Sequence, residues 1–405
     1  RHFCLSRGLG DVYKRQIFNV RVGTYAEQVT LGAIPGSSDI NTVIFQSEAL
    51  DSSQVSLHYS SSNPSYDYTL YFDSCSNVIF KDIGVLRSGG DYAIRIEGGC
   101  SNLDFRNGIF GNIYSSSSSV DTDISVQNSV CQQIDIRGKS TSDRATNITV
   151  TGNNISASKN HDGTIDFSGV RLENVSDGLV YGNDIYSGVY AGTNGWSCSA
   201  ISAYSVFVSG CDSVRVEGNT MSSYSDSYYF NCQSRALGFL CSSSYNCVFK
   251  SNDITVHAND GKSDAIGFNI DNSDNIYVSG SNFDIRSSGD SQGYVHPQAA
   301  NISCDDCIIS GNVFDSFSSS SFWRGISYSG MRSTIDSNII YENESGIIIS
   351  SGSDNIVEKN SISSSITTGI SVSGSNNIIR MNRLLNMTST ALEISSSDNE
   401  LSNNY

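Results

Sequence analysis

The sequence predicts an all-β protein, a single right-handed parallel β-helix with three sides and about a dozen coils. Three observations lead to this prediction. An Asn recurs every 22 residues near the C-terminal end, short runs of alternating apolar residues precede it, and the 405 residues include only 3 prolines. Alternation over a few residues indicates short strands with one buried face. Few prolines suit such strands, because proline cannot donate to a ladder of backbone hydrogen bonds.

The repeat is clearest near the C-terminal end. Its first Asn recurs at Asn355, Asn377 and Asn399. An apolar residue opens a short strand seven positions before each of them, at Ile348, Ile370 and Leu392. Each repeat then reads as three short strands separated by turns. Asn and Gly suit such corners because they adopt the left-handed backbone conformation cheaply, and stacked Asn side chains can hydrogen-bond from coil to coil.

The same offset of seven residues, or eight at Ile94 where Gly98-Gly99 adds one, places the openings of the earlier coils. The predicted openings are Leu70, Ile94, Ile134, Val170, Val206, Phe239, Phe268, Ala300 and Ile326. Between residues 110 and 147 either Ile124 or Ile134 could open the coil, and the Ile134–Ile136 alternation favours the latter. Stacking a dozen coils at ~4.8 Å each gives a rod roughly 55–60 Å long. The last coils are minimal, whereas those from residue 94 to about 326 contain long inserts.

The repeat predicts one β-helix domain over residues 17–405, because a solenoid grows in one dimension without dividing. Residues 1–16 share neither the period nor the composition of the rest and lack the apolar core of a signal peptide. We expect them to be a foreign or disordered lead-in. Tyr405 stops within a coil, so we expect the C-terminal end to be truncated. The sequence contains no transmembrane segment.

The charge balance excludes one class of partner and disfavours another. A net charge of −17 argues against nucleic acid, whose binding needs a basic surface. It also makes an anionic polysaccharide an unfavourable partner unless Ca²⁺ bridges the two. Beyond a possible Ca²⁺, the sequence indicates no cofactor and no metal site, and it does not indicate the oligomeric state.

The 11 cysteines favour an extracellular or cell-surface location with disulfides. Cys75 and Cys100 should stack in neighbouring coils, within disulfide range. Cys304 and Cys307 have the spacing of a zinc-ligand pair, but no second pair completes a site, so a local disulfide or two packed thiols is preferred. Five others gather where the inserts are long, at Cys198, Cys211, Cys232, Cys241 and Cys247.

A family resemblance rests on the C-terminal repeats. The pattern Gly-Ile-x-apolar, followed by Asn-x-apolar-x-x-Asn-x-apolar, occurs at 346–362 and 369–384. It resembles the β-helix repeats of the pectate-lyase-like superfamily, most closely the carbohydrate-binding and sugar-hydrolase type. Residues 22–31 also resemble the first strand of such helices. The resemblance covers roughly residues 17–405 and implies a secreted protein that engages polysaccharide. It selects no single activity, because one solenoid hosts many functions.

Long inserts on a rigid rod predict a lateral groove, since binding and catalysis concentrate in such loops. The middle residue of each opening strand should face outward, so these residues should form a column along the rod. The column reads Tyr71, Arg95, Asp135, Arg171, Phe207, Leu240, Asn269, Asn301, Ser327, Ile349, Ser371 and Glu393. Aromatic rings with Arg and Asp offer a sugar chain stacking planes and bidentate hydrogen bonds. A strand face whose charges pair with one another would explain the same residues without a ligand.

The candidate substrate-binding residues are Tyr71 and Phe207, and the candidate catalytic residues are Arg95, Asp135, Arg171, Asp166 and His161. Asp135 and Asp166 could be the two carboxylates of glycoside hydrolysis. Arg95 or Arg171 could be the base of a polysaccharide lyase, and His161 an acid or base. The sequence thus predicts an extracellular polysaccharide-engaging protein, either a lyase or a hydrolase. The alternatives are a non-catalytic adhesin or spacer rod, and a phage-type tailspike.

Overall fold

The structure is a computed structural model that describes most of the chain. It describes residues 15–405 except 61–66, 89–91, 117, 119, 162–164, 192–200, 227–232, 260–261, 289–296, 319–323, 342–343 and 365–366. The regular elements of this part are all strands, paired in parallel. No helix of the length and apolarity needed to span a membrane occurs within it. The described residues therefore form an all-β solenoid, as the sequence predicts.

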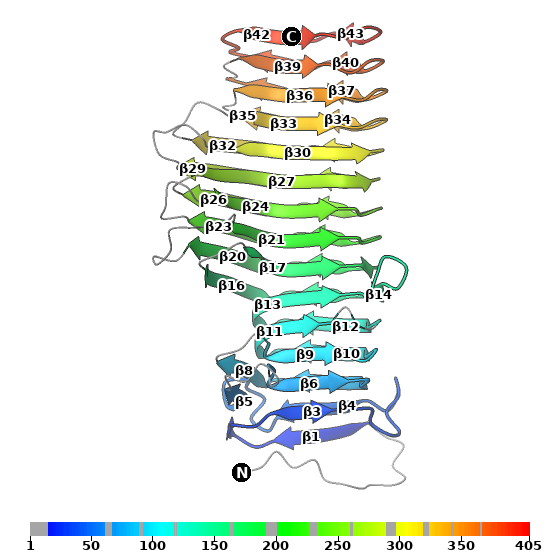
Figure 1. The fold of residues 1–405 in the computed structure, drawn as a ribbon, viewed down its shortest axis with the longest axis vertical. Coiled ribbons are helices and arrows are strands. Elements are labelled where there is room, and N and C mark those ends of the chain that lie inside the picture. Colours follow the sequence, from blue (N-terminus) through cyan, green and yellow to red (C-terminus); the bar gives the residue numbers. More distant parts are fainter. Residues whose placement is uncertain are drawn as a thin grey trace. The chain divides into compact units, whose positions relative to one another are not determined.

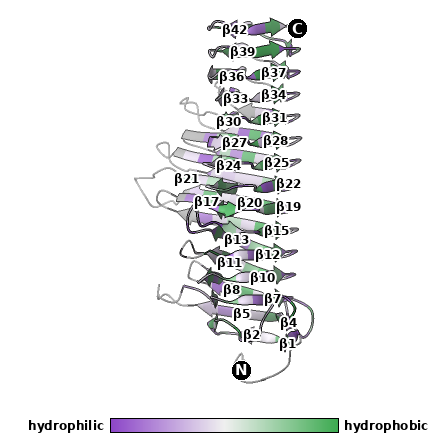
Figure 2. Cartoon of the chain, turned by 90° about the vertical axis from the view of Figure 1, so that its right-hand side faces the viewer, coloured by the Kyte–Doolittle hydropathy of each residue, from purple (hydrophilic) through white to green (hydrophobic). Residues whose placement is uncertain are grey.

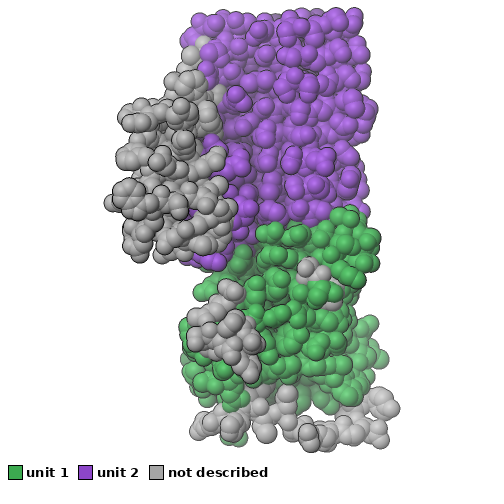
Figure 3. All heavy atoms as spheres, in the orientation of Figure 1, with its two compact units in different colours: residues 1–156, 170–184 green, residues 157–169, 185–405 purple. Residues whose placement is uncertain are grey.

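The chain divides into two compact units (Figure 3). Unit 1 comprises residues 1–156 and 170–184, and unit 2 comprises residues 157–169 and 185–405. In each unit a coil contributes up to three strands, which we assign to an opening, a middle and a closing series. Strands of one series from successive coils hydrogen-bond side by side, as β36, β39 and β42 do in unit 2 (Figure 1).

The strands β1 to β19 lie mainly in unit 1. Its opening series is β3 (Val29–Leu31), β6 (Leu70–Asp73), β9 (Ile94–Glu97), β11 (Ile109–Ser115), β13 (Val130–Arg137) and β17 (Ile165–Glu173). Its middle series is β1 (Gln16–Val20), β4 (Val43–Ser47), β7 (Ser76–Lys81), β10 (Ser101–Arg106), β12 (Thr122–Gln127), β14 (Ala145–Thr146), β15 (Thr149–Thr151), β18 (Val175–Ser176) and β19 (Leu179–Tyr181). Its closing series is β2 (Gly23–Tyr25), β5 (Val55–Ser60), β8 (Gly84–Ser88), the first halves of β11 and β13, and β16 (Asn154–His161).

The strands from β20 onward lie mainly in unit 2. The opening series is β21 (Ile201–Ser209), β24 (Gln233–Ser242), β27 (Lys262–Asp274), β30 (Gln298–Asp305), β33 (Arg324–Ser329), β36 (Ser345–Ser351), β39 (Thr368–Val372) and β42 (Thr390–Ile394). The middle series is β22 (Arg215–Glu217), β25 (Val248–Lys250), β28 (Tyr277–Ser279), β31 (Ile308–Ser310), β34 (Thr334–Asp336), β37 (Ile356–Glu358), β40 (Ile378–Arg380) and β43 (Glu400–Ser402). The closing series is β20 (Asp184–Ala191), β23 (Thr220–Asp226), β26 (Asp253–Asn259), β29 (Asn282–Ser288), β32 (Val313–Ser318), β35 (Ile339–Tyr341), β38 (Ser361–Ser363) and β41 (Arg383–Leu385).

The core lies inside the coils because alternate strand residues point inward. Hydrophilic and hydrophobic residues both occur along β27 (Figure 2), where Phe268 and Ile270 are fully buried and Asn269 between them is not. In unit 2 the inward side chains form stacks. The Phe239 ring lies 4.1 Å from Phe249 and 4.9 Å from Phe268, measured between ring centroids. The stacked rings and the fully buried isoleucines of later coils bury the apolar area that stabilises the solenoid.

The predicted asparagine ladder is confirmed within unit 2. The side-chain oxygen of Asn360 accepts hydrogen bonds from the backbone N–H and the side-chain amide of Asn338, each at 3.0 Å. Asn360 in turn donates to the carbonyl oxygen of Ile335 at 2.8 Å and to Asn382 at 3.0 Å. Each ladder Asn thus satisfies backbone groups of neighbouring coils where the chain turns away from the sheet.

The corner role assigned to the C-terminal ladder asparagines is wrong. Positive φ angles there belong to the residue before each of them, as at Ser337, Lys359 and Met381. In unit 1 the predicted role holds, since Asn77 and Asn102 themselves have φ angles of 61° and 53°. In the last coils one residue therefore adopts the turn geometry, and the Asn that follows it makes the ladder hydrogen bonds.

Two coil openings differ from the prediction. A strand through Ile113 lies between those of Ile94 and Ile134, where the sequence indicated none. In unit 2 the partner of Ile326 is Ile347, so Ile348 faces outward and Ile349 is buried, the reverse of the expectation. At Ile348 a bulge explains why a fixed offset fails, because it inserts one unpaired residue. One such irregularity lies between Ile270 and Ser273, and another near Ser329.

The cysteines follow the prediction in part. Cys304 and Cys307 lie within range of a local disulfide, with their α-carbons 6.1 Å apart. Cys75 and Cys100 are stacked neighbours, since the N–H of Cys75 donates to the Cys100 sulfur at 3.3 Å, but both are free thiols. Cys211, Cys241 and Cys247 are also buried free thiols. Residues 1–14, Cys198 and Cys232 lie outside the described residues.

Candidate functional site

Four of the predicted site residues lie in one outward column of unit 1. Tyr71 pairs with Arg95, Arg95 with Tyr114, Tyr114 with Asp135, and Asp135 with Arg171. The column comes from the opening strands β6, β9, β11, β13 and β17. Tyr114 was missed because its coil was missed. Arg95 and Arg171 are therefore three strand spacings apart, roughly 14 Å, rather than the two that the sequence indicated.

A second outward column runs two residues further along the same strands. It places Glu97 beside Arg95, Arg137 beside Asp135, and Glu173 beside Arg171, because residues i and i+2 of a strand share a face. Arg137 pairs with Glu173 in the sheet register. We call the two columns together the unit 1 strip. Its members are Tyr71, Arg95, Glu97, Tyr114, Asp135, Arg137, Arg171 and Glu173.

The strip is held together by ion pairs and hydrogen bonds. Arg95 contacts Glu97 at 2.6 Å and Asp67 at 2.8 Å between nitrogen and oxygen. The hydroxyl of Tyr71 donates to Glu97 at 2.9 Å, and the Arg95 guanidinium carbon lies 5.8 Å from the centre of the Tyr71 ring. With Asp67 beside it, the first half of the strip is thus a cluster of one cation, two carboxylates and one ring.

The second half of the strip repeats this chemistry. Arg137 donates to both oxygens of Asp135, at 2.8 and 2.7 Å. Arg171 donates to Glu173 at 3.0 Å, and Glu173 also lies 3.9 Å from Arg137. The guanidinium of Arg137 lies 5.4 Å from the centre of the Tyr114 ring. Arg–carboxylate pairs therefore recur along the face, the Arg137–Asp135 pair is bidentate, and Arg95 and Arg137 each lie beside a tyrosine ring.

Burial and neighbouring charges shift the pKa values in the strip. Burial alone would lower the pKa of Arg95, but the hydrogen bonds and charges of Glu97 and Asp67 outweigh it and raise that pKa. Burial would raise the pKa of Glu97, yet Arg95 and Tyr71 hold it below its usual value. Burial and the bond to Glu97 raise the pKa of Tyr71. Arg95 and Glu97 therefore stay charged at neutral pH.

The other predicted site residues belong to unit 2. Asp166 is exposed, and the Tyr204 hydroxyl donates to it at 3.3 Å. Phe207 is half-buried, with its ring edge-on to Tyr204 at 5.5 Å. The backbone of His161 ends β16, and its side chain lies outside the described residues. The pairing of Asp135 with Asp166 stays a prediction.

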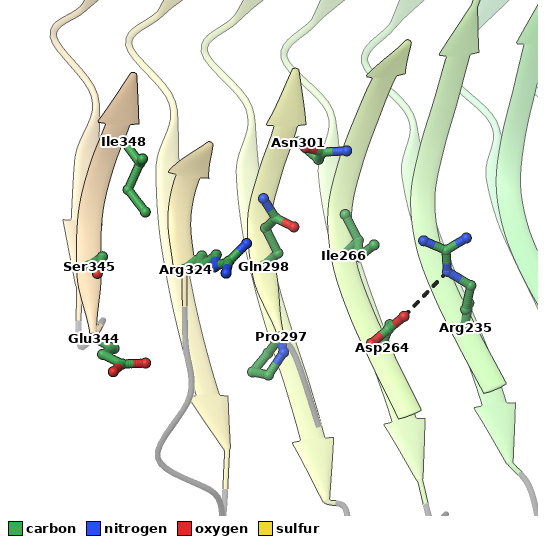
Figure 4. Close-up of a pocket in the computed structure, with 10 residues that line it drawn as sticks. All are labelled: Arg235, Asp264, Ile266, Pro297, Gln298, Asn301, Arg324, Glu344, Ser345 and Ile348. Carbon is green, nitrogen blue, oxygen red and sulfur yellow. Dashed lines mark ion pairs between the residues drawn. The ribbon is translucent and has the colours of Figure 1, made fainter. Parts of the chain in front are cut away.

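Unit 2 contains a pocket that the sequence reasoning did not find (Figure 4). It has a volume of about 460 Å³ and lies on the outer face of β24, β27, β30, β33 and β36. Its lining is Arg235, Asp264, Ile266, Pro297, Gln298, Asn301, Arg324, Glu344, Ser345 and Ile348. Most of these residues precede the inward residue that opens each coil. The outward column predicted from the sequence contains only the residues that follow the opening residues. Of the lining, only Asn301 belongs to that column.

The pocket combines balanced charges with amides. Arg235 and Asp264 are partners in the sheet register, and Arg235 Nε lies 3.4 Å from a carboxylate oxygen of Asp264. Gln298 lies between Ile266 and Arg324 in the register of its sheet. Within the described residues no cluster of three His, Cys, Asp or Glu side chains suits a metal ion. The pocket therefore offers donors and acceptors for a polar organic ligand.

Comparison with known families identifies the fold. Residues 267–405 match a family model described as a right handed beta helix region. Together with the parallel pairing of the described strands, this match makes the fold a right-handed parallel β-helix. A comparison of the sequence with curated proteins finds no match.

Solved structures resemble this chain at low identity. Tailspike protein 3 of bacteriophage CBA120 has a TM-score of 0.38 and 11% identity, over 96% of this chain and 56% of the tailspike. A mannuronic acid specific family 6 polysaccharide lyase from human gut microbiota has a TM-score of 0.33 and 11% identity, over 96% and 81%. The surface adhesin PfbA of Streptococcus pneumoniae has a TM-score of 0.33 and 9% identity, over 88% and 85%. The chain thus spans little more than half of the tailspike, and the fold assignment rests on the strand pairing and the family match.

Proposed function

We propose that this protein is an extracellular or cell-surface β-helix that binds polysaccharide through the unit 1 strip. The observation that supports the proposal is the recurrence of Arg–carboxylate pairs and tyrosine rings on one outward face. A planar guanidinium and a carboxylate can each engage two neighbouring hydroxyls, and an aromatic ring can pack against the apolar face of a sugar. The 11 cysteines and the close approach of Cys304 and Cys307 support a location outside the cytosol.

The pairing within the strip favours binding. Ion pairs between Arg95 and Glu97, and between Arg137 and Asp135, hold the donors and acceptors in fixed positions. Less conformational entropy is then lost when a sugar chain docks. The raised pKa of Arg95 favours a role as a hydrogen-bond donor over a role as the base of a lyase. Catalysis by Asp135, Asp166, Arg171 or His161 is a separate hypothesis with a separate measurement.

Binding to immobilised glycans tests the proposal. We expect Arg95→Ala and Arg171→Ala each to weaken binding about 10- to 100-fold, the effect of losing hydrogen bonds from a charged group. Arg106→Ala is the matched control, because Arg106 lies on the middle strand β10 and should leave binding unchanged. Arg95→Lys keeps the charge beside Glu97 but removes the planar fork, so it separates lost recognition from lost stability. Binding that survives the double substitution Arg95→Ala with Arg171→Ala would overturn the proposal.

A panel of polysaccharides separates binding from catalysis. New reducing ends without unsaturated ends would indicate a glycoside hydrolase. New unsaturated ends would indicate a polysaccharide lyase, which frees a reducing end as well. If the protein binds a glycan but releases neither, it acts as an adhesin or spacer. Parallel assays with and without Ca²⁺ would detect a bridging ion, which an anionic polysaccharide would need against a net charge of −17.

A further inference from the structure

We propose that the pocket of unit 2 is a second glycan site, which takes an uncharged, hydroxyl-bearing sugar rather than a uronate. The site is distinct from the unit 1 strip, so its failure would leave the proposed function standing. Its volume of about 460 Å³ lies within the range of ligand sites. It extends across five neighbouring strands, from Arg235 on β24 to Ser345 on β36 (Figure 4). Four strand spacings amount to about 19 Å, which suits a short oligosaccharide lying across the strands.

The charges of the pocket balance. Arg235 is paired with Asp264, and the second cation and anion are Arg324 and Glu344. Within the described part of the chain, no ion pair includes the side chain of Arg324 or Glu344. Arg324 therefore presents a donor fork, and Glu344 presents two acceptor oxygens. Vicinal hydroxyls of a sugar can accept hydrogen bonds from Arg324 and donate hydrogen bonds to Glu344.

The amide and apolar side chains of the pocket also suit a neutral sugar. The side-chain amide N–H of Gln298 donates to the carbonyl oxygen of Ala300 at 3.0 Å, and that of Asn301 donates to Asn269 at 2.9 Å. Each contact fixes the amide, whose carbonyl oxygen can still accept from a hydroxyl. Ile266 lies between Gln298 and Arg235, and Ile348 lies at one end of the pocket, so each adds apolar surface (Figure 4). The pocket thus combines a mainly polar lining with some apolar contact, which suits a sugar with its many hydroxyls.

The carboxylates of the pocket and the net negative charge of the protein disfavour a uronate. A sugar carboxylate beside Arg324 would share the pocket with the carboxylates of Glu344 and Asp264, which repel it. The net charge of −17 adds a long-range repulsion against any polyanion. Arg235 and Arg324 would likewise repel a cationic sugar. A neutral sugar avoids both penalties and still uses every polar group.

Ligand-observed NMR and calorimetry test the site with defined probes. The probes are neutral gluco-, manno- and galacto-oligosaccharides, with oligogalacturonate as the anionic comparison. We expect at least one neutral oligosaccharide to bind, with an affinity that changes less than about twofold between low and high salt, because no net charge is neutralised. Preferential binding of oligogalacturonate that weakens with salt would overturn the proposal. Failure of every neutral probe to bind would also overturn it.

Substitutions locate the binding within the protein. We expect Glu344→Gln and Arg324→Ala each to weaken neutral-sugar binding about 10- to 100-fold. Arg215→Ala is the matched control, because Arg215 lies on the middle strand β22, paired with Glu217. Glu344→Gln preserves shape, so its melting temperature should match that of the unsubstituted protein. Neutral-sugar binding that both pocket variants leave intact, or that Arg95→Ala abolishes instead, would refute this site.

Discussion

Arg95 is held on the outward face of unit 1 by Glu97 and Asp67. The sequence could predict its outward direction and the nearness of Glu97, because residues two apart in a strand share a face. It could not predict Asp67, which lies 28 residues away on the far side of an undescribed segment. Local periodicity thus specifies which way a side chain points, whereas partners in another coil depend on the lengths of the connecting loops.

Glu97 should make the stability of unit 1 depend on pH. Its pKa is lower in the folded protein than its usual 4.5, so ionised Glu97 stabilises the fold above that pH. This contribution is lost as the pH falls through the folded pKa. We expect Glu97→Gln to lower the free energy of unfolding by about 1 to 3 kcal/mol at pH 7, because Arg95 and Tyr71 lose a charged partner. Denaturant unfolding at pH 7 and at pH 3 measures the difference.

The difference between the two proteins should shrink in acid, since the carboxyl of Glu97 is then protonated in the unfolded chain and its ionised form stabilises the fold less. Asp143→Asn is the matched control, because Asp143 pairs with Lys139 on the exposed surface. It should change the free energy of unfolding by less than about 0.5 kcal/mol. A Glu97→Gln effect that is equal at both pH values would contradict the ionic origin.

At the scale of elements, the ladder strands show which features of the fold the sequence repeat can predict. The recurrence of 22 residues was sufficient to predict three strands per coil and stacked asparagines. It was insufficient for the register of every strand, because a bulge changes the offset without changing the residue types. Ile113 was missed since it lies less than one period after Ile94. The pocket was missed because β24 and β27 start well before the residues that open their coils.

Asn360→Ala should damage the ladder at its centre. The substitution leaves the backbone N–H of Asn338 and the carbonyl oxygen of Ile335 unsatisfied in a fully buried corner. We expect a loss of about 2 to 4 kcal/mol in the free energy of unfolding. Faster hydrogen exchange at Asn338 should accompany it, and mass spectrometry of peptides from β34 and β35 would detect it.

Ser361→Ala, at the next residue, is the matched control for this substitution. Ser361 is only half-buried, so its loss should cost less than about 0.5 kcal/mol. Equal costs for the two substitutions would mean that the ladder hydrogen bonds do not stabilise the corner.

The whole molecule is strongly acidic, with 41 Asp and Glu residues against 24 Lys and Arg residues. Composition alone predicted this property, together with the exclusion of nucleic acid as a partner. The single domain over residues 17–405 stays a prediction, since each of the two units is compact by itself. Neither oligomeric state nor ligand follows from a repeat, because coils of the same shape can present unrelated outward faces.

Solubility should follow the net charge. Protonation of the carboxylates removes the −17 charge near pH 4.5, so mutual repulsion between molecules vanishes there. We expect turbidity of a concentrated solution to peak between about pH 4 and 5 and to fall on return to pH 7. A turbidity maximum near neutral pH would show that exposed apolar surface, and not charge, governs association.

The equal spacing of the last ladder asparagines has a consequence for how such a gene can change. Asn355 and Asn377 occupy equivalent corners, and Ile356 and Val357 pair with Ile378 and Ile379. Excising residues 355–376 would therefore join Asp354 to Asn377 and present the same kinds of side chain to the coil before. Recombination in whole-coil steps can lengthen or shorten this end while the reading frame and the register both survive. Evolution can thus adjust length there independently of the sites on the longer coils.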